Sequence, residues 1–207
     1  ILDQWILSRL YQTVKEIRKQ MEVYDLTKAS RPIAEFIDDL SNWYIRRSRR
    51  QFQKPKNKKQ KKNALVILGY VLSELAKMSA PFMPFISEEI YQRLPLRSKE
   101  DSVHLERYPD VEREFINPNL EEDMKKTREI AQRVLAERAK AKIKIRQPLS
   151  LLKIRDPKFK TKNQKKLLDL IKEEVNVKEI VIDKRFYLNK KITPALWEEG
   201  VIREIIR

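Results

Sequence analysis

Apolar residues recur every three or four positions through the first half of the chain, which is typical of amphipathic helices that bury one face. The stripes occupy residues 5–24, 33–44, 65–79 and 85–94. We expect a break over residues 25–32, with Pro32 close to the start of the second helix. Pro81 and Pro84 predict a sharp corner before the fourth. Antiparallel packing is the simplest way to bury all four stripes.

The pattern changes twice in the second half. Residues 95–118 contain three prolines and predict a linker, after which Asn117 and Pro118 suit the start of a fifth helix reaching residue 142. Beyond it, strand-like runs over residues 143–154 and 177–182 flank another helical pattern. Pro148 indicates an edge position for the first of these strands.

The predicted fold is therefore mainly α, an antiparallel helical bundle followed by a small mixed α/β subdomain. We assign residues 1–94 to the bundle, 95–142 to a linker and a long helix that completes it, and 143–207 to the subdomain. Both ends of the chain, Ile1 and Arg207, fall inside helical patterns. We therefore expect a fragment of a longer polypeptide.

Composition excludes several kinds of chemistry. The 207 residues include two glycines, so a glycine-rich phosphate-binding loop is absent, and no cysteine, so no thiolate metal site or disulfide exists. His104 is the single histidine, and we expect an ordinary packed side chain in a short extended piece. No apolar run of membrane-spanning length is present. We predict no catalytic, cofactor-binding or metal site.

The distribution of charge along the chain indicates the kind of ligand that it binds. The formal net charge is +16, and residues 46–62 contain ten Lys or Arg and no Asp or Glu. A segment without carboxylates cannot form a salt-bridged helix face, so it should be mobile unless a polyanion binds it. Trp43 and Tyr44 lie one turn earlier, and aromatic rings beside guanidinium groups suit single-stranded RNA. The alternatives are a solvated loop, and core positions for the two rings.

A second basic run, softened by Asp156, lies in the predicted subdomain. It comprises Lys153, Arg155, Lys158, Lys160, Lys162, Lys165 and Lys166. The chain could therefore offer two separate phosphate contacts.

The segment Ser41–Arg50 closely resembles the centre of the helical anticodon-binding domain of isoleucyl-tRNA synthetases. Further segments with the same likeness cover nearly the whole chain: Leu2–Leu10, Tyr24–Ala29, Ala80–Tyr91, Ile145–Ser150, Asn176–Glu179 and Thr193–Gly200. The chain departs from the family at Phe52-Gln53, where relatives often carry Trp after Phe. It departs again at residues 54–62, a segment that is usually mixed in charge in the family and whose charged residues are all lysine here.

The resemblance implies a cytoplasmic enzyme that joins isoleucine to its tRNA with ATP and magnesium and edits mischarged products. This fragment would bind the anticodon stem and loop of isoleucine tRNA, while the catalytic and editing domains of the same polypeptide lie elsewhere. The tRNA-binding residues implied are Ser41, Asn42, Trp43, Arg46, Arg47, Arg49, Arg50, Lys54 and Lys58. Arg46, Arg49 and Arg50 share one helix face, whereas Arg47 points about 100° away. Trp43 is either a stacking platform or supporting core.

Three other interpretations are open. A free-standing basic RNA-binding module would explain the basic density, but chain ends inside helical patterns argue against it. The segments Arg146–Ser150 and Asn176–Glu179 disfavour the equivalent domain of a valyl- or leucyl-tRNA synthetase. A platform for protein partners would instead show an exposed apolar patch.

Overall fold

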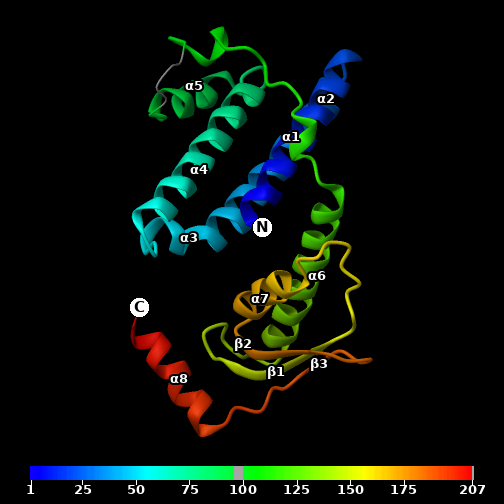
Figure 1. The fold of residues 1–207 in the computed structure, drawn as a ribbon, viewed down its shortest axis with the longest axis vertical. Helices are drawn as coiled ribbons and strands as arrows, with labels where there is room; N and C mark the ends of the chain where they lie inside the picture. The colour runs from blue at the N-terminus through cyan, green and yellow to red at the C-terminus, as the bar shows by residue number, and fades with distance from the viewer. Residues whose placement is uncertain (96–99, 207) are drawn as a thin grey trace. The chain divides into compact units, whose positions relative to one another are not determined.

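The computed structural model describes residues 1–95 and 100–206, so part of the predicted linker and Arg207 lie outside the described residues. Its contacts divide the chain into two compact units, residues 1–117 and 118–207 (Figure 1). The first contains α1 (Leu2–Glu22), α2 (Leu26–Asp38), the π-helix η1 (Asp39–Ile45), α3 (Arg46–Gln53), α4 (Lys58–Ser79), α5 (Pro84–Arg93) and the 3₁₀ turns η2 (Val103–Leu105) and η3 (Arg113–Phe115). The second contains α6 (Pro118–Lys140), β1 (Leu149–Ile154), α7 (Gln164–Glu174), β2 (Val177–Ile182), β3 (Tyr187–Leu188) and α8 (Pro194–Ile205). The predicted fold class, a helical bundle followed by a small α/β part, is confirmed.

The core of the first unit forms around α1, which packs against α2 and α4. Its buried face includes Trp5, Ile6, Leu10, Val14 and Ile17 at the predicted spacing, whereas Tyr24, the last residue of the predicted stripe, lies past the end of the helix and is exposed. The helix α2 begins at Leu26, seven residues before the predicted start, because the Asp25 side chain accepts a hydrogen bond from the Lys28 amide at 2.9 Å and caps it. Pro32 lies inside α2. Its missing N–H removes one helical bond without ending the helix.

The helix continues without a break from α2 through η1 into α3. Buried positions recur there at Phe36, Leu40, Tyr44 and Ser48, each four residues apart. In an α-helix that spacing drifts by about 40° per step, so the buried face would rotate away from α1. The wider π-helical turns of η1 keep these positions facing the core.

Two local predictions from the sequence are wrong. The sequence predicts that the lysine-rich stretch around residues 54–63 interrupts the helices. It is helical from Lys58 onward, so only residues 54–57 form the connection between α3 and α4. The piece around His104 is the 3₁₀ turn η2 rather than extended chain, and the His104 side chain is exposed rather than packed. Ser102 caps this turn through its hydroxyl, which favours the helical turn over a strand.

The second unit is built on a three-stranded sheet of order β2-β1-β3. The central strand β1 pairs in parallel with β2 and antiparallel with β3. Pro148 directly precedes β1, so the missing amide N–H lies outside the ladder and the predicted edge position is wrong. Helix α6 contacts α7 and belongs to this second unit. The first unit therefore ends at residue 117, whereas the sequence predicts boundaries at residues 94 and 142.

Helix α8 is attached to its unit chiefly by polar bonds. Lys178 and Glu199 form an ion pair of 2.6 Å, Arg146 and Glu204 one of 2.9 Å, and Arg203 donates to Asn176 at 2.7 Å. No helix in the described residues is long and apolar enough to cross a membrane. The same residues contain no cluster of His, Asp and Glu able to hold a metal ion.

Candidate nucleic-acid interface

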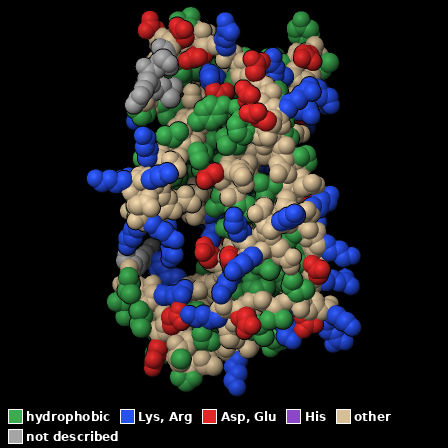
Figure 2. Space-filling view, in the orientation of Figure 1, with side chains coloured by type: hydrophobic (Ala, Val, Ile, Leu, Met, Phe, Trp, Pro, Cys, Tyr) green, Lys and Arg blue, Asp and Glu red, His purple; other side chains and the backbone are tan. Residues whose placement is uncertain are grey.

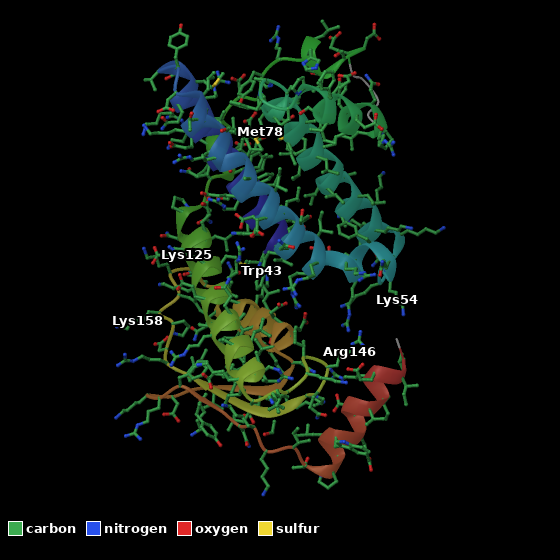
Figure 3. All side chains as sticks on the ribbon, turned by 180° about the vertical axis from the view of Figure 1, so that it is seen from behind. Trp43, Lys54, Met78, Lys125, Arg146 and Lys158 are labelled. Carbon is green, nitrogen blue, oxygen red and sulfur yellow. The ribbon has the colours of Figure 1, made fainter. Side chains whose placement is uncertain are left out.

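The ten cations of residues 46–62, which we call the basic corner, lie on α3, on the connection 54–57 and on the start of α4. Figure 2 shows Lys and Arg side chains gathered around this part of the first unit. Figure 3 labels Lys54 at the turn between the two helices. All six lysines of the corner are exposed. The corner therefore presents a surface of one charge sign, as polyanion binding requires.

The arginines of α3 are distributed as the helical spacing predicts. Arg46, Arg49 and Arg50 are exposed on one face, whereas Arg47 is half-buried. Bonds along the helix orient two of these guanidinium groups. Arg46 Nε donates to the Asn42 carbonyl at 3.0 Å, and Arg49 Nε donates to Gln53 Oε1 at 3.0 Å. A guanidinium has five N–H donors in a planar fork, a geometry that matches phosphate oxygens.

Lysines also cover the first turns of α4, where the sequence offers no acidic residue. The N-terminus of a helix carries a partial positive charge, so Lys58 and Lys59 add like charge where Asp or Glu is favoured. A long helix N-terminus surrounded by cations is suited to bind an anion such as phosphate.

A capping motif that apolar periodicity does not reveal fixes this helix start. Asn57 Oδ1 accepts from the Gln60 amide at 2.8 Å, and Gln60 Oε1 accepts from the Lys56 amide at 2.8 Å. The spacing Asn-x-x-Gln is visible in the sequence and is a signal for such a reciprocal cap.

Trp43 and Tyr44 belong to the core beneath the arginines. Trp43 is 5% exposed, and Tyr44 is fully buried and donates its hydroxyl to Asp3 Oδ1 at 2.8 Å. Burial, with the bond to Asp3, raises the pKa of the Tyr44 phenol. Of the two predicted roles for Trp43, this structure is compatible with supporting core, because a base has no open ring face on which to stack.

Polar bonds between α1 and η1 complete this support. Arg9 Nε and Asp39 Oδ2 form a half-buried ion pair of 2.8 Å. Ser41 and Asn42 are exposed on η1, where Asn42 Nδ2 donates to Asp38 Oδ1 at 2.5 Å. The structure thus places the predicted residues on the continuous helical segment of η1 and α3, on the connection 54–57 and at the start of α4, where Figure 3 labels Trp43 and Lys54. The Trp43 side chain is buried.

The second basic run is more dispersed. Lys153 pairs with Asp183 at 2.8 Å and Lys160 with Glu122 at 2.5 Å, so part of its charge is neutralised locally. The pKa of the Asp183 carboxyl is lowered by the hydrogen bond from Lys153. This run therefore offers a weaker positive surface than the basic corner.

The chain is similar in sequence to one protein family and to individual proteins of known name. Residues 3–153 match the family model described as the anticodon-binding domain of tRNA ligase. The chain is 42% identical over 180 residues to the isoleucine–tRNA ligase of Chlamydia pneumoniae, an alignment covering 87% of the chain and 17% of the relative. It is 41% identical over 183 residues to that of Chlamydia caviae, covering 88% and 18%. The chain thus spans less than a fifth of the length of these relatives.

Proposed function

The chain belongs to the family of anticodon-binding domains of tRNA ligases, and from that premise we propose that it is the tRNA-binding region of an isoleucine–tRNA ligase. The identity of about 40% to isoleucine–tRNA ligases over most of the chain supports this amino-acid assignment. The equivalent domain of a valyl- or leucyl-tRNA synthetase is the alternative within the same family.

The basic corner is the observation that carries the proposal. Its ten cations have no carboxylate within the segment, and α3 presents Arg46, Arg49 and Arg50 on one exposed face. Phosphate contacts from such a surface supply affinity and fix the register of the RNA. Ser41 and Asn42 are exposed next to the arginines and add polar groups for sugar or base edges.

The proposed division of labour assigns the chemistry to other parts of a longer polypeptide. Those parts would bind isoleucine, ATP and magnesium and would carry the editing site, in the cytoplasm where aminoacyl-tRNA is used. This region would hold the anticodon end of the tRNA. Binding far from the reacting atoms still accelerates transfer, because it reduces the entropy lost in reaching the transition state.

The test is binding of the chain to isoleucine tRNA and to valine tRNA over a salt titration. A second protein, the corner variant, carries Arg46→Gln, Arg49→Gln, Arg50→Gln, Lys54→Gln and Lys58→Gln. We expect tighter binding of isoleucine tRNA and a slope of log K against log salt of several, at about 0.7–0.9 per phosphate neutralised. The corner variant should lose at least about tenfold in affinity at low salt.

Each result separates the candidate functions. Equal affinity for both tRNAs, with equal slopes, would support a basic RNA-binding module that does not read the anticodon. Preference for valine tRNA would support the valyl alternative. No binding by the unaltered chain at low salt would exclude RNA binding by this region.

A further inference from the structure

A second cationic site lies in the α/β unit, away from the basic run that the sequence indicates. It is an open cleft of about 570 Å³ between α6 and the segment that contains β3, which we call the Arg133 cleft. Its lining residues are Arg133, Glu137, Phe186, Tyr187, Leu188, Asn189, Lys190 and Lys191. This volume is within the range of sites that bind small ligands.

Two of the lining side chains, Arg133 and Phe186, stack on each other. The guanidinium carbon of Arg133 lies 4.0 Å from the centre of the Phe186 ring, a cation–π contact. One face of the guanidinium is covered by the ring, while its N–H edges stay available to oxygen acceptors. The neighbouring Tyr187 is 51% exposed, so the cleft also offers an aromatic side chain to a nucleobase.

The charge balance of the cleft favours an anion. Glu137 accepts from Lys190 at 3.0 Å and from Lys140 at 3.1 Å, which lowers the pKa of its carboxyl and keeps it ionised and paired. Within the described part of the chain, no carboxylate lies at ion-pair distance from Arg133 or Lys191. These two cations are therefore the ones available to a bound phosphate.

The wall of the cleft is held by the sheet. Lys153 and Leu152 of β1 pair with Tyr187 and Leu188 of β3. The Asn189 amide donates to the Leu151 carbonyl at 3.0 Å, and the Lys191 amide donates to Asn189 Oδ1 at 3.1 Å. The aromatic and cationic groups thus stand on an ordered scaffold, which reduces the entropy lost when a ligand binds.

We propose that the Arg133 cleft binds single-stranded RNA, with a base stacked against Tyr187 or the Arg133–Phe186 pair and a phosphate held by Arg133 and Lys191. The proposal rests on the proposed function in that both take RNA as the ligand, but it concerns a separate set of residues. Stacking on aromatic rings with phosphate contacts at the rim accepts any base sequence. The cleft would therefore add affinity without reading the anticodon.

The test uses the whole 207-residue chain and an eight-nucleotide oligouridylate that carries a fluorescent label. The cleft variant combines Arg133→Gln with Lys191→Gln, and its matched control combines the exposed Lys125→Gln and Lys172→Gln, which remove the same charge outside the cleft. We expect the cleft variant to weaken binding about tenfold and to reduce the salt slope by about 0.7, because the two cations share one phosphate. The control should change affinity less than about twofold.

Separate measurements distinguish stacking from charge. Tyr187→Ala should weaken binding about fivefold or more with an unchanged salt slope, because it removes stacking and no cation. Arg133→Lys keeps the charge and should fall between the unaltered chain and Arg133→Gln. Melting temperatures of all variants establish that they are folded.

The corner variant, assayed with the same oligonucleotide, separates this proposal from the proposed function. Loss of affinity in the corner variant alone would overturn the Arg133 cleft and leave the proposed function in place. Loss in the cleft variant alone would support the cleft and count against the basic corner. If AMP displaces the oligonucleotide at micromolar concentration, the cleft is a mononucleotide site and the single-stranded RNA assignment is overturned.

Discussion

At the scale of single residues, Trp43 is a buried support of the proposed RNA-binding surface. Its ring is buried beneath the exposed arginines of α3, in contact with the core rather than with solvent. We predict that Trp43→Phe lowers the free energy of unfolding by about 1–3 kcal/mol, because the smaller ring leaves a cavity. The affinity for tRNA under native conditions should stay within about twofold. Urea unfolding and tRNA binding measure the two quantities.

Trp197→Phe is the matched control, since Trp197 on α8 is 59% exposed. That change should leave both stability and tRNA affinity close to those of the unaltered chain. A tenfold loss of tRNA affinity in folded Trp43→Phe would contradict the core role and restore the stacking platform.

Arg138 is a second residue whose contribution is structural. It is 1% exposed and donates from Nη2 to the carbonyls of Lys144 at 2.6 Å, Ile145 at 3.3 Å and Gln147. Burial lowers the pKa of its guanidinium. We predict that Arg138→Lys destabilises the chain by about 1–3 kcal/mol, because an ammonium cannot reproduce the planar donor group that organises this loop. Chemical denaturation followed by circular dichroism measures the loss.

Arg185→Lys provides the comparison for this substitution, since Arg185 is exposed. Its stability should change by less than about 0.5 kcal/mol. Equal stabilities for the two variants would show that the carbonyl contacts of Arg138 contribute nothing measurable.

Among the helices, α4 combines an N-terminus that is unfavourable for stability with the binding function that we propose for its lysines. Lys58 occupies its first position, where the helix dipole disfavours a cation. We predict that Lys58→Glu stabilises the chain by about 0.3–1 kcal/mol at low ionic strength and weakens tRNA binding. Thermal melting should show the gain in stability, and a tRNA-binding titration at the same salt concentration should show the loss of affinity.

Lys15→Glu on α1 makes the same change of charge at an exposed position far from a helix end. It should not reproduce the gain in stability. If Lys15→Glu stabilised the chain as much as Lys58→Glu does, relief of the overall positive charge, and not the helix dipole, would be the cause.

The helix α8 should lose part of its attachment in acid. Hydrogen bonds from Lys178 and, less strongly, Arg203 lower the pKa of the Glu199 carboxyl below its ordinary value of 4.5. A lowered folded-state pKa contributes stability that is present above 4.5 and is lost as the pH falls through the lowered value. We predict that Glu199→Gln melts at a lower temperature than the unaltered chain at pH 6. The difference should shrink toward zero as the pH falls below 4.5.

Glu198→Gln is the control for this helix, because Glu198 is exposed and the ion pairs are made by the adjacent Glu199. It should melt with the unaltered chain throughout the titration. A Glu199→Gln difference that stayed constant with pH would count against the ion pairs as its origin.

Most elements follow from the periodicity of apolar residues, and the exceptions have local causes. The spacing of Trp5, Leu10 and Val14 specifies α1, and the strand β2 has the predicted bounds. The start of α2 is set by the Asp25 cap, whereas Pro32, which predicts a later start, is tolerated inside the helix. The central position of β1 depends on pairing with β2 and β3, which are distant in sequence, and residue spacing alone does not reveal it.

At the scale of the whole molecule, the candidate site was partly visible in the sequence. The density of charge over residues 46–62 and the shared face of Arg46 and Arg49 could be read from spacing. The inward orientation of Trp43 could not, because helical spacing does not say which neighbours cover a ring. The Arg133 cleft was also missed, since Arg133 and Phe186 are brought together only by the folding of the second unit.

The distribution of charge over the whole chain leads to the last prediction. The basic corner holds ten of the sixteen net positive charges, and the other 190 residues share the remaining six. We compare the corner variant with a dispersed variant that replaces five exposed lysines elsewhere by glutamine: Lys15, Lys19, Lys125, Lys172 and Lys184. Both lose five charges and have the same net charge, so long-range attraction falls equally in the two proteins.

The corner variant should reduce the slope of log K against log salt for tRNA by about 3.5, at 0.7 for each of five lost phosphate contacts. The dispersed variant should change the slope by less than about 1, because a lysine that touches no phosphate releases no counterion from the RNA. Equal slopes in the two variants would mean that tRNA responds to the net charge and not to its placement. A larger loss of slope in the corner variant would locate the RNA backbone on α3 and the start of α4.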